Sequence, residues 1–378
     1  MNRIPWYIWL SVLGVTSAMI GAHWDISWHR SIGRDSFWTP AHIAIQLCGV
    51  IAGITCGYLI LWTTFTHSQL RAASSVYEAS VSVLGFRGPL GAFICAWGGF
   101  TMITSAPFDD WWHNAYGLDV KILSPPHVAL AIGLEAVEIG AMVLIAAGMN
   151  RSSGRTRRNL EWLFLYVNSM ILVELLTAVL ELTNRSFLHT AICYRSICIL
   201  TPIVLAIASR ATRLRWAATT VSAIYTAFIL GMLWILPLFP AQPKLGPVMH
   251  EVKQFIPADF PLLVLIPALM LDLVWPRMAL WNQWKHAAVS GALFFAVLVP
   301  VEWLFADFMQ SPLARNAFFG TIYLDYFQSP QGYAATYRFV PYETAGQFRI
   351  GMAIALACAI ISAWLGMGAG DWLKRVRR

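Results

Sequence analysis

Long apolar runs recur along this chain of 378 residues, and no other feature limits its fold so strongly. About twenty apolar residues in a row let one helix cross the hydrocarbon core of a bilayer. Only 12% of the residues are charged, whereas a soluble domain carries about 25%. The sequence therefore excludes a soluble globular protein and a disordered one. The runs do not alternate in polarity as the strands of a membrane β-barrel do, so a helical membrane protein remains.

We predict an all-α polytopic membrane protein with about ten transmembrane helices. The expected spans lie near residues 5–22, 41–64, 88–106, 127–149, 160–182, 190–209, 217–239, 260–275, 286–306 and 347–370. The first span could instead be a cleaved signal peptide, but its apolar run is long for one and we favour an uncleaved helix. We expect a metal-site domain over residues 1–150, with spans 1–4, and a C-terminal membrane domain over residues 151–378 with no assigned role.

Basic residues are concentrated in the loops on one side of these spans. That side holds 16 of the 26 Lys and Arg residues: Arg3, Arg71, Arg87, Arg151, Arg155, Arg157, Arg158, Arg210, Arg213, Arg215, Arg277, Lys285, Lys374, Arg375, Arg377 and Arg378. Because positively charged loops stay inside, both termini are expected in the cytoplasm of a bacterium, with the protein in the inner membrane. The net charge of +7 is thus a signal of topology and not of nucleic-acid binding.

Two loops on the opposite, periplasmic side repeat one pattern of polar residues. The pattern is Asp-x3-His, followed after twelve or thirteen residues by a second His. The matched positions are Asp25 and Asp109, Trp28 and Trp112, His29 and His113, Gly33 and Gly117, Asp35 and Asp119, Pro40 and Pro125, and His42 and His127. Each copy joins two spans of the same orientation, so the sequence predicts a parallel repeat of two helical hairpins.

The residue types in each copy suit a metal ion. Asp25 and His29 are four residues apart and share one face of a helix. His42 opens the next span after Pro40, a residue that favours a helix start. Each copy therefore offers one carboxylate and two imidazoles, a set used for oxygen chemistry at non-haem iron and also suited to copper or zinc. The alternative is a set of interfacial polar residues that bind one another and lipid headgroups, and the duplication argues against it.

The stretch from Trp28 to His42 resembles the C subunit of the copper membrane monooxygenases, the family of particulate methane monooxygenase and ammonia monooxygenase. The residues in the family's order and spacing are Asp25, Trp28, His29, Arg34, Asp35, Phe37, Thr39, Pro40 and His42. The resemblance covers about residues 20–135. It implies two adjacent copper sites at the outer membrane face, made by Asp25, His29, His42 and by Asp109, His113, His127. The second site of the family looks Asn-based where this chain has Asp109.

The resemblance further implies a monooxygenase, or its metal-bearing C-type subunit, that oxidises a small apolar substrate with O2. It implies one or two copper ions, with iron or zinc less favoured. Besides membrane lipid, the implied partners are A-type and B-type subunits or further copies of this chain. Quinol or another donor would supply electrons, because the chain carries no electron-carrier motif and nothing that resembles a cupredoxin.

Other polar residues are expected to surround the ions or to carry protons. These are Trp28, Arg34, Asp35, Gln46, Trp112, Asp119, Glu135 and Glu138. Arg34 and Asp35 would form an orienting salt bridge, and His23 is an additional candidate ligand. Glu138 lies below His127 on one helical face, where a carboxyl could pass protons or simply tie helices together. For His189 and His250 we expect surface roles, and for Glu302 and Asp307 helix packing.

A metal or small-solute transporter of the inner membrane is the main alternative function. The parallel repeat and the intramembrane Glu residues would suit it. A copper pathway should however contain a ladder of soft Met or Cys ligands, and the 13 Met residues are scattered. The six Cys residues lie in or at the edges of apolar spans and are expected to pack as small hydrophobic residues. A diiron hydroxylase is disfavoured because only His67 and His286 lie on the cytoplasmic side.

Overall fold

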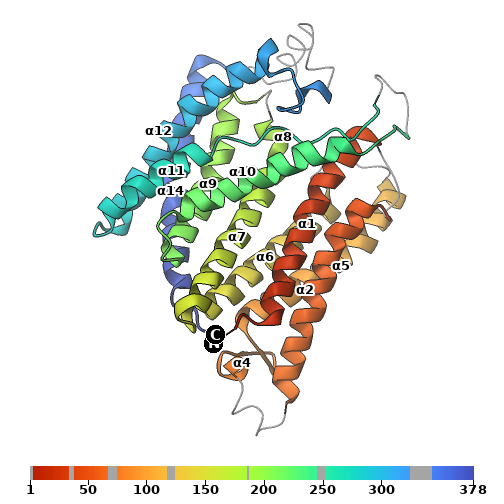
Figure 1. The fold of residues 1–378 in the computed structure, drawn as a ribbon, viewed down its shortest axis with the longest axis vertical. Coiled ribbons are helices and arrows are strands. Elements are labelled where there is room, and N and C mark those ends of the chain that lie inside the picture. Colours follow the sequence, from red (N-terminus) through yellow and green to blue (C-terminus); the bar gives the residue numbers. More distant parts are fainter. Residues whose placement is uncertain are drawn as a thin grey trace. The chain divides into compact units, whose positions relative to one another are not determined.

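A computed structural model describes residues 3–33, 38–66, 75–116, 124–184, 187–244, 252–323 and 343–378. The chain is mostly helical, as predicted (Figure 1). It forms two compact units. The first unit comprises Met1–Ala22, Asp35–Ile171 and Trp372–Arg378, and the second comprises His23–Arg34 and Leu172–Asp371. The functional division expected after residue 150 stays a prediction.

The first unit is built around three long helices that follow one another in the sequence. These are α2 (Pro40–Phe65), α5 (Leu90–Tyr116) and α6 (Pro125–Asn150). The first part of α1 (Trp6–Ser31) and most of α7 (Gly154–Ala178) belong to the same unit. A short helix, α4 (Ser75–Glu78), precedes a small hairpin.

That hairpin was not expected from an all-α prediction. Its strands are β1 (Val81–Val83) and β2 (Phe86–Gly88), and they pair in antiparallel fashion. Leu84 and Gly85 both have positive φ, at 50° and 84°, which suits the two-residue turn of a hairpin. The expected span at 88–106 in fact begins with α5 directly after this hairpin.

Glycines bring α5 and α6 into close contact. A methyl group at Gly91 would lie 2.4 Å from the carbonyl oxygen of Gly140, and one at Gly98 would lie 2.6 Å from that of Gly133. Both distances are too short for a real Cβ atom, so the backbones meet where only hydrogen fits. Small residues allow such close packing between membrane helices, where van der Waals contact contributes most of the attraction.

The second unit contains the last two turns of α1, the end of α7 and most of the C-terminal half. Its further elements are α8 (Leu180–Thr183), α9 (Ala191–Ala211), α10 (Ala217–Ile235), η1 (Leu236–Leu238), α11 (Leu265–Val274), η2 (Trp275–Met278), α12 (Gln283–Gln310), η3 (Pro312–Ala314), η4 (Thr321–Tyr323) and α14 (Ala345–Leu373), whose last two residues belong to the first unit. A segment that forms neither helix nor strand, residues 252–264, precedes α11.

Eight helices in the described residues are long and apolar enough to cross a membrane. Their ranges are Pro40–Phe65, Leu90–Tyr116, Pro125–Asn150, Gly154–Ala178, Ala191–Ala211, Ala217–Leu238, Gln283–Gln310 and Ala345–Leu373. Each coincides with a predicted span, so a multi-pass helical membrane protein is supported. The predicted total of ten is not confirmed. The expected span at 260–275 contains only the ten-residue helix α11, which at 1.5 Å per residue is about 15 Å long.

Helix α1 is the other expected span outside these eight. It has 26 residues, but Trp, Tyr, Ser and His residues reduce its hydropathy.

In contrast, α2 presents a continuous apolar face to its surroundings. The exposed residues recur every three or four positions: Ile43, Leu47, Val50, Ile54, Tyr58, Leu61, Trp62 and Phe65. Such a stripe of exposed large apolar side chains fits contact with lipid.

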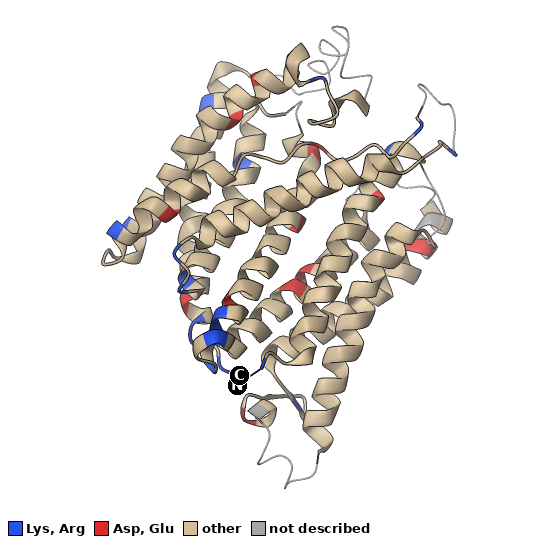
Figure 2. Ribbon diagram, viewed as in Figure 1, with Lys and Arg blue, Asp and Glu red and all other residues tan. Residues whose placement is uncertain are grey.

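Two basic segments lie together in the first unit. The side-chain amide of Asn150, at the end of α6, donates to the carbonyl oxygens of Leu373 and Val376, at 2.7 Å each. Figure 2 shows Lys and Arg gathered around this end of the unit. The loop after α6 and the C-terminal tail, both predicted to be cytoplasmic, are therefore neighbours.

A buried carboxylate holds the start of α10 in the second unit. Asp272, only 2% exposed, accepts hydrogen bonds from the backbone and hydroxyl of Thr219, both at 2.7 Å, and a longer one from the backbone of Ala218. A negative charge at a helix N-terminus also opposes the helix dipole favourably. The side chain of Asp272 thus ties α11 to α10.

Replacing Asp272 with alanine is expected to destabilise the protein by about 2–3 kcal/mol, because buried N–H groups would lose a charged acceptor. The midpoint of thermal unfolding in detergent measures this effect. Asp110→Ala, which removes an exposed carboxylate near the end of α5, is the matched control and should change the midpoint far less. Equal midpoints for the two variants would contradict the capping role.

Candidate metal sites

The first candidate pair lies in the last two turns of α1. Asp25 and His29 are one turn apart, and the Nε2 atom of His29 lies 3.5 Å from Oδ2 of Asp25. The predicted i, i+4 geometry is therefore present. The side chain of His29 is 45% exposed and that of Asp25 is 21% exposed. An ion could reach this pair without a rearrangement of the helix.

The second candidate pair joins two helices of the first unit. Asp109 lies near the end of α5, and His127 is the third residue of α6. Nε2 of His127 lies 3.6 Å from Oδ1 of Asp109. The antiparallel packing of α5 on α6 through glycines brings the two helix ends, and hence these two side chains, together. His113 lies in α5, and its side chain is outside the described residues.

His42 occupies the same helical position in α2 that His127 has in α6. Each is the third residue of a helix that starts with proline, at Pro40 and at Pro125. The hydroxyl of Thr39 caps α2 and accepts the backbone N–H of His42 at 3.2 Å. Asp25 and His29 belong to the second unit and His42 to the first, so their convergence on one ion stays a prediction.

The donor sets fit a copper or zinc ion. Two ligand atoms that share one ion at about 2.0–2.1 Å in tetrahedral geometry lie about 3.4 Å apart. The observed separations of 3.5 Å and 3.6 Å between carboxylate oxygen and imidazole nitrogen are close to this value. Both separations are also long for a direct hydrogen bond, in which 2.7–3.2 Å is usual. Each pair can therefore hold an ion with little movement of the side chains.

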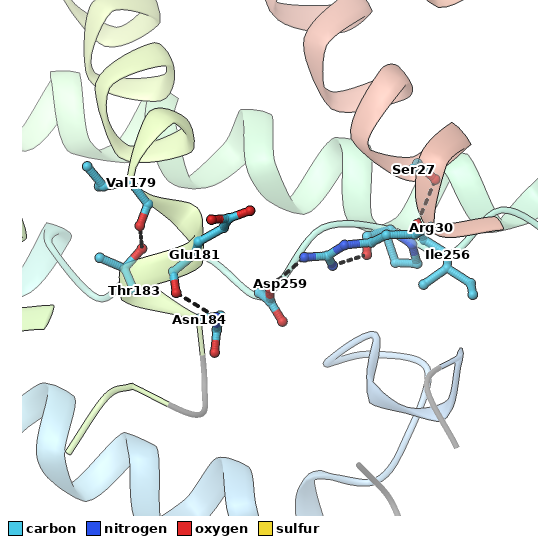
Figure 3. A network of polar contacts seen from close by, with 9 residues as sticks. Ser27, Arg30, Val179, Glu181, Thr183, Asn184, Ile256 and Asp259 are labelled. Atoms are coloured by element: carbon cyan, nitrogen blue, oxygen red, sulfur yellow. Dashed lines mark hydrogen bonds and ion pairs between the residues drawn. The ribbon is translucent and has the colours of Figure 1, made fainter. Parts of the chain in front are cut away.

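The end of α1 is anchored to the irregular segment 252–264, which precedes α11 (Figure 3). The guanidinium of Arg30 donates to the carbonyl oxygen of Pro257 at 2.9 Å and to the carboxylate of Asp259 at 3.1 Å. Ser27 donates to the carbonyl oxygen of Ile256, and the hydroxyl of Ser31 accepts the N–H of the same residue at 2.6 Å. Within the second unit, these bonds fix the helical turn that carries Asp25 and His29.

The sequence does not predict these bonds between α1 and residues 256–259. Their partners are more than 220 positions apart in the chain, and backbone groups of residues 256 and 257 leave no signal in the sequence. The one available hint was Arg30, a basic residue next to His29 on the side predicted to be poor in charge.

The other predicted site residues differ in their placement. Trp28 packs on Phe255, with ring centroids 5.8 Å apart, and the ammonium of Lys244 lies over its ring. Trp112 packs on Tyr116 at 4.5 Å. Gln46 is half-buried one turn after His42, Glu138 is fully buried in α6, and Glu135 is half-buried beside it. Arg34, Asp35 and Asp119 lie outside the described residues. Roles for these residues around an ion stay predictions.

His23 and His189 also lie in the second unit. His23, expected as an extra ligand, is 1% exposed, contacts the hydroxyl of Thr177 at 3.3 Å and packs edge-on against Phe228. His189, expected to have a surface role, lies 3.0 Å from Asp307 and packs on Trp303. His250 is outside the described residues.

We compared the chain with models of protein families, with curated proteins and with solved structures, and none of the three comparisons found a match. The evidence for a function therefore consists of the two carboxylate–imidazole pairs and the repeated sequence motifs.

Proposed function

We propose that this chain is a copper-binding integral membrane protein that acts as a monooxygenase or as its metal-bearing subunit. The observation that carries the proposal is one carboxylate–imidazole pair in each motif: Asp25 lies near His29, the first histidine of its motif, and Asp109 lies near His127, the second histidine of its own. Asp25, His29 and His42 would hold one ion, and Asp109, His113 and His127 would hold a second. Imidazole donors suit copper, and the motif from Trp28 to His42 resembles the copper membrane monooxygenases.

The reaction proposed is the oxidation of a small apolar substrate by O2. Bound copper would supply the reactivity toward O2. The chain itself would bind the ion through Asp and His and hold α1 in place through Arg30. Exposed apolar residues of α5, among them Phe100 and Ile103, precede Asp109 along the helix. A substrate dissolved in lipid could approach the second pair along this apolar face.

The proposed setting is the bacterial inner membrane, with the metal pairs on the periplasmic side. Electrons would come from quinol or another donor. Partners would be A-type and B-type subunits or other copies of this chain. The resemblance to the monooxygenase family and the excess of basic residues on the other side support these assignments.

Metal analysis of the purified protein tests the proposal. The wild type, loaded with copper and desalted, should retain the ion, and the double variant His29→Ala/His42→Ala should lose the copper of the first site. His189→Ala, a histidine outside both motifs, is the matched control and should retain the wild-type amount. A double variant that holds as much copper as the wild type would end the proposal.

A further inference from the structure

A small cavity in the second unit contains a buried carboxyl group that the copper proposal does not use. The cavity has a volume of about 20 Å³. It lies between α8, the irregular segment 252–264, α12 and the segment around η4. Glu302 of α12 lines it and is only 1% exposed. A volume of this size holds about one water molecule or one small ion.

Only one of the two carboxylate oxygens of Glu302 has a hydrogen-bond partner among the described residues. The Oε2 atom accepts the backbone N–H of Leu263 at 2.9 Å, while Oε1 is buried and has no hydrogen-bond partner among the residues that the structure describes. A buried carboxylate with an unused oxygen is costly unless a positive charge or a hydrogen-bond donor compensates it. The unused oxygen and the adjacent space together point to a missing ligand.

The charges around the cavity indicate which ligand would fit. None of the described residues that line the cavity is basic. The second acid on its wall, Asp259, already pairs with Arg30 at 3.1 Å. Cys193, Tyr194 and Tyr225 are near Glu302, and their ordinary forms carry no charge. If Glu302 is ionised, its single negative charge has no basic partner among the described lining residues, and a monovalent cation would balance that charge whereas a divalent one would exceed it.

The wall also offers oxygen atoms for such an ion. Thr183 of α8 and Thr321 of η4 line the cavity. The hydroxyl of Thr183 donates to the carbonyl oxygen of Val179. The hydroxyl of Thr321 donates to the carbonyl oxygen of Ala314 and accepts the backbone N–H of Asn316 at 3.1 Å, so the oxygen of Thr183 is more readily available to a cation (Figure 3 shows Thr183 and Asp259). Phe260, Phe305 and Phe319 are among the apolar residues that line the cavity. Aromatic faces attract weakly hydrated cations and exclude bulk water.

We infer that the Glu302 cavity binds one small monovalent cation, Na⁺ or K⁺, through a carboxylate and threonine oxygens. This site is independent of the copper pairs. It would connect α12 to α8 and to the segment that anchors α1, so cation binding should stabilise the second unit.

The test uses the full chain purified in detergent. Binding of radioactive sodium should saturate in the wild type, and sodium or potassium chloride should raise the unfolding midpoint above that in choline chloride of equal ionic strength. Comparison of the two salts identifies the preferred ion. Glu302→Gln, which can still accept the N–H of Leu263, should weaken cation binding more than about tenfold, equal to 1.4 kcal/mol.

Two further variants keep the result interpretable. Glu181→Gln removes an exposed acid of α8 and should bind the cation as the wild type does. Thr183→Val removes one hydroxyl from the wall and should weaken binding without abolishing it. Absence of saturable sodium or potassium binding in the wild type would overturn the inference and leave Glu302 as a protonated packing residue. Equal binding by the wild type and Glu302→Gln would overturn it as well.

Discussion

Replacing Asp109 with alanine is expected to abolish copper binding at the second site and to leave the first site intact. The reason is that Asp109 supplies the only carboxylate of the predicted second triad, 3.6 Å from its partner His127. Loss of a group that merely orients a ligand reduces metal affinity about 10–100-fold, and loss of a direct ligand should exceed this range. Copper titration of the purified variant, followed by metal analysis, measures the effect.

The neighbouring residue provides the matched control. Asp110 is exposed on α5, and its carboxylate lies 3.4 Å from the side-chain amide of Asn114. Asp110→Ala removes the same charge from the same helix end without touching the predicted triad. Asp110→Ala should therefore bind as much copper as the wild type. A similar loss in both variants would indicate non-specific attraction of copper to an acidic surface and would contradict a second site.

Replacing Gly98 with alanine should strongly disturb the packing of α5 on α6. The added methyl group would lie 2.6 Å from the carbonyl oxygen of Gly133 and 2.7 Å from the backbone nitrogen of Val137. Backbone atoms cannot turn away as a flexible side chain can, so the two helices must separate. Overpacking of this kind costs about 1–3 kcal/mol. The same separation should weaken copper binding by Asp109 and His127 at the far end of these helices.

A glycine in α2 serves as the control for this substitution. A methyl group at Gly57 would meet nothing within 4 Å. Gly57→Ala should leave the thermal midpoint unchanged or raise it slightly, since glycine inside a helix costs about 0.5–1 kcal/mol relative to alanine. If Gly98→Ala and Gly57→Ala unfold at the same temperature as the wild type, the close contact between α5 and α6 is wrong.

The sequence was most informative where the signal is local. Hydropathy located all eight candidate spans, and the spacing of Asp25 and His29 predicted their contact because a helix fixes the geometry of residues four apart. The repeat also indicated that Asp109 and His127 should meet across a loop, and these two side chains lie 3.6 Å apart.

The sequence was less informative where the fold depends on distant partners. Arg30 binds Asp259 across 229 positions, and Glu302 accepts the N–H of Leu263 from a segment without periodic pattern. The expected span at 260–275 contains only the ten-residue helix α11, because residues 252–264 form neither helix nor strand although residues 260–264 are apolar. An apolar run alone does not distinguish a span from a buried segment of irregular backbone.

We propose that each repeated motif gathers one acid and two imidazoles around a copper ion. X-ray diffraction from copper-loaded crystals at the copper absorption edge would locate these ions. We expect one anomalous peak bonded to Asp25, His29 and His42, and a second bonded to Asp109, His113 and His127. A map with no anomalous peak at either motif, and with the three side chains of each motif pointing apart, would contradict the account.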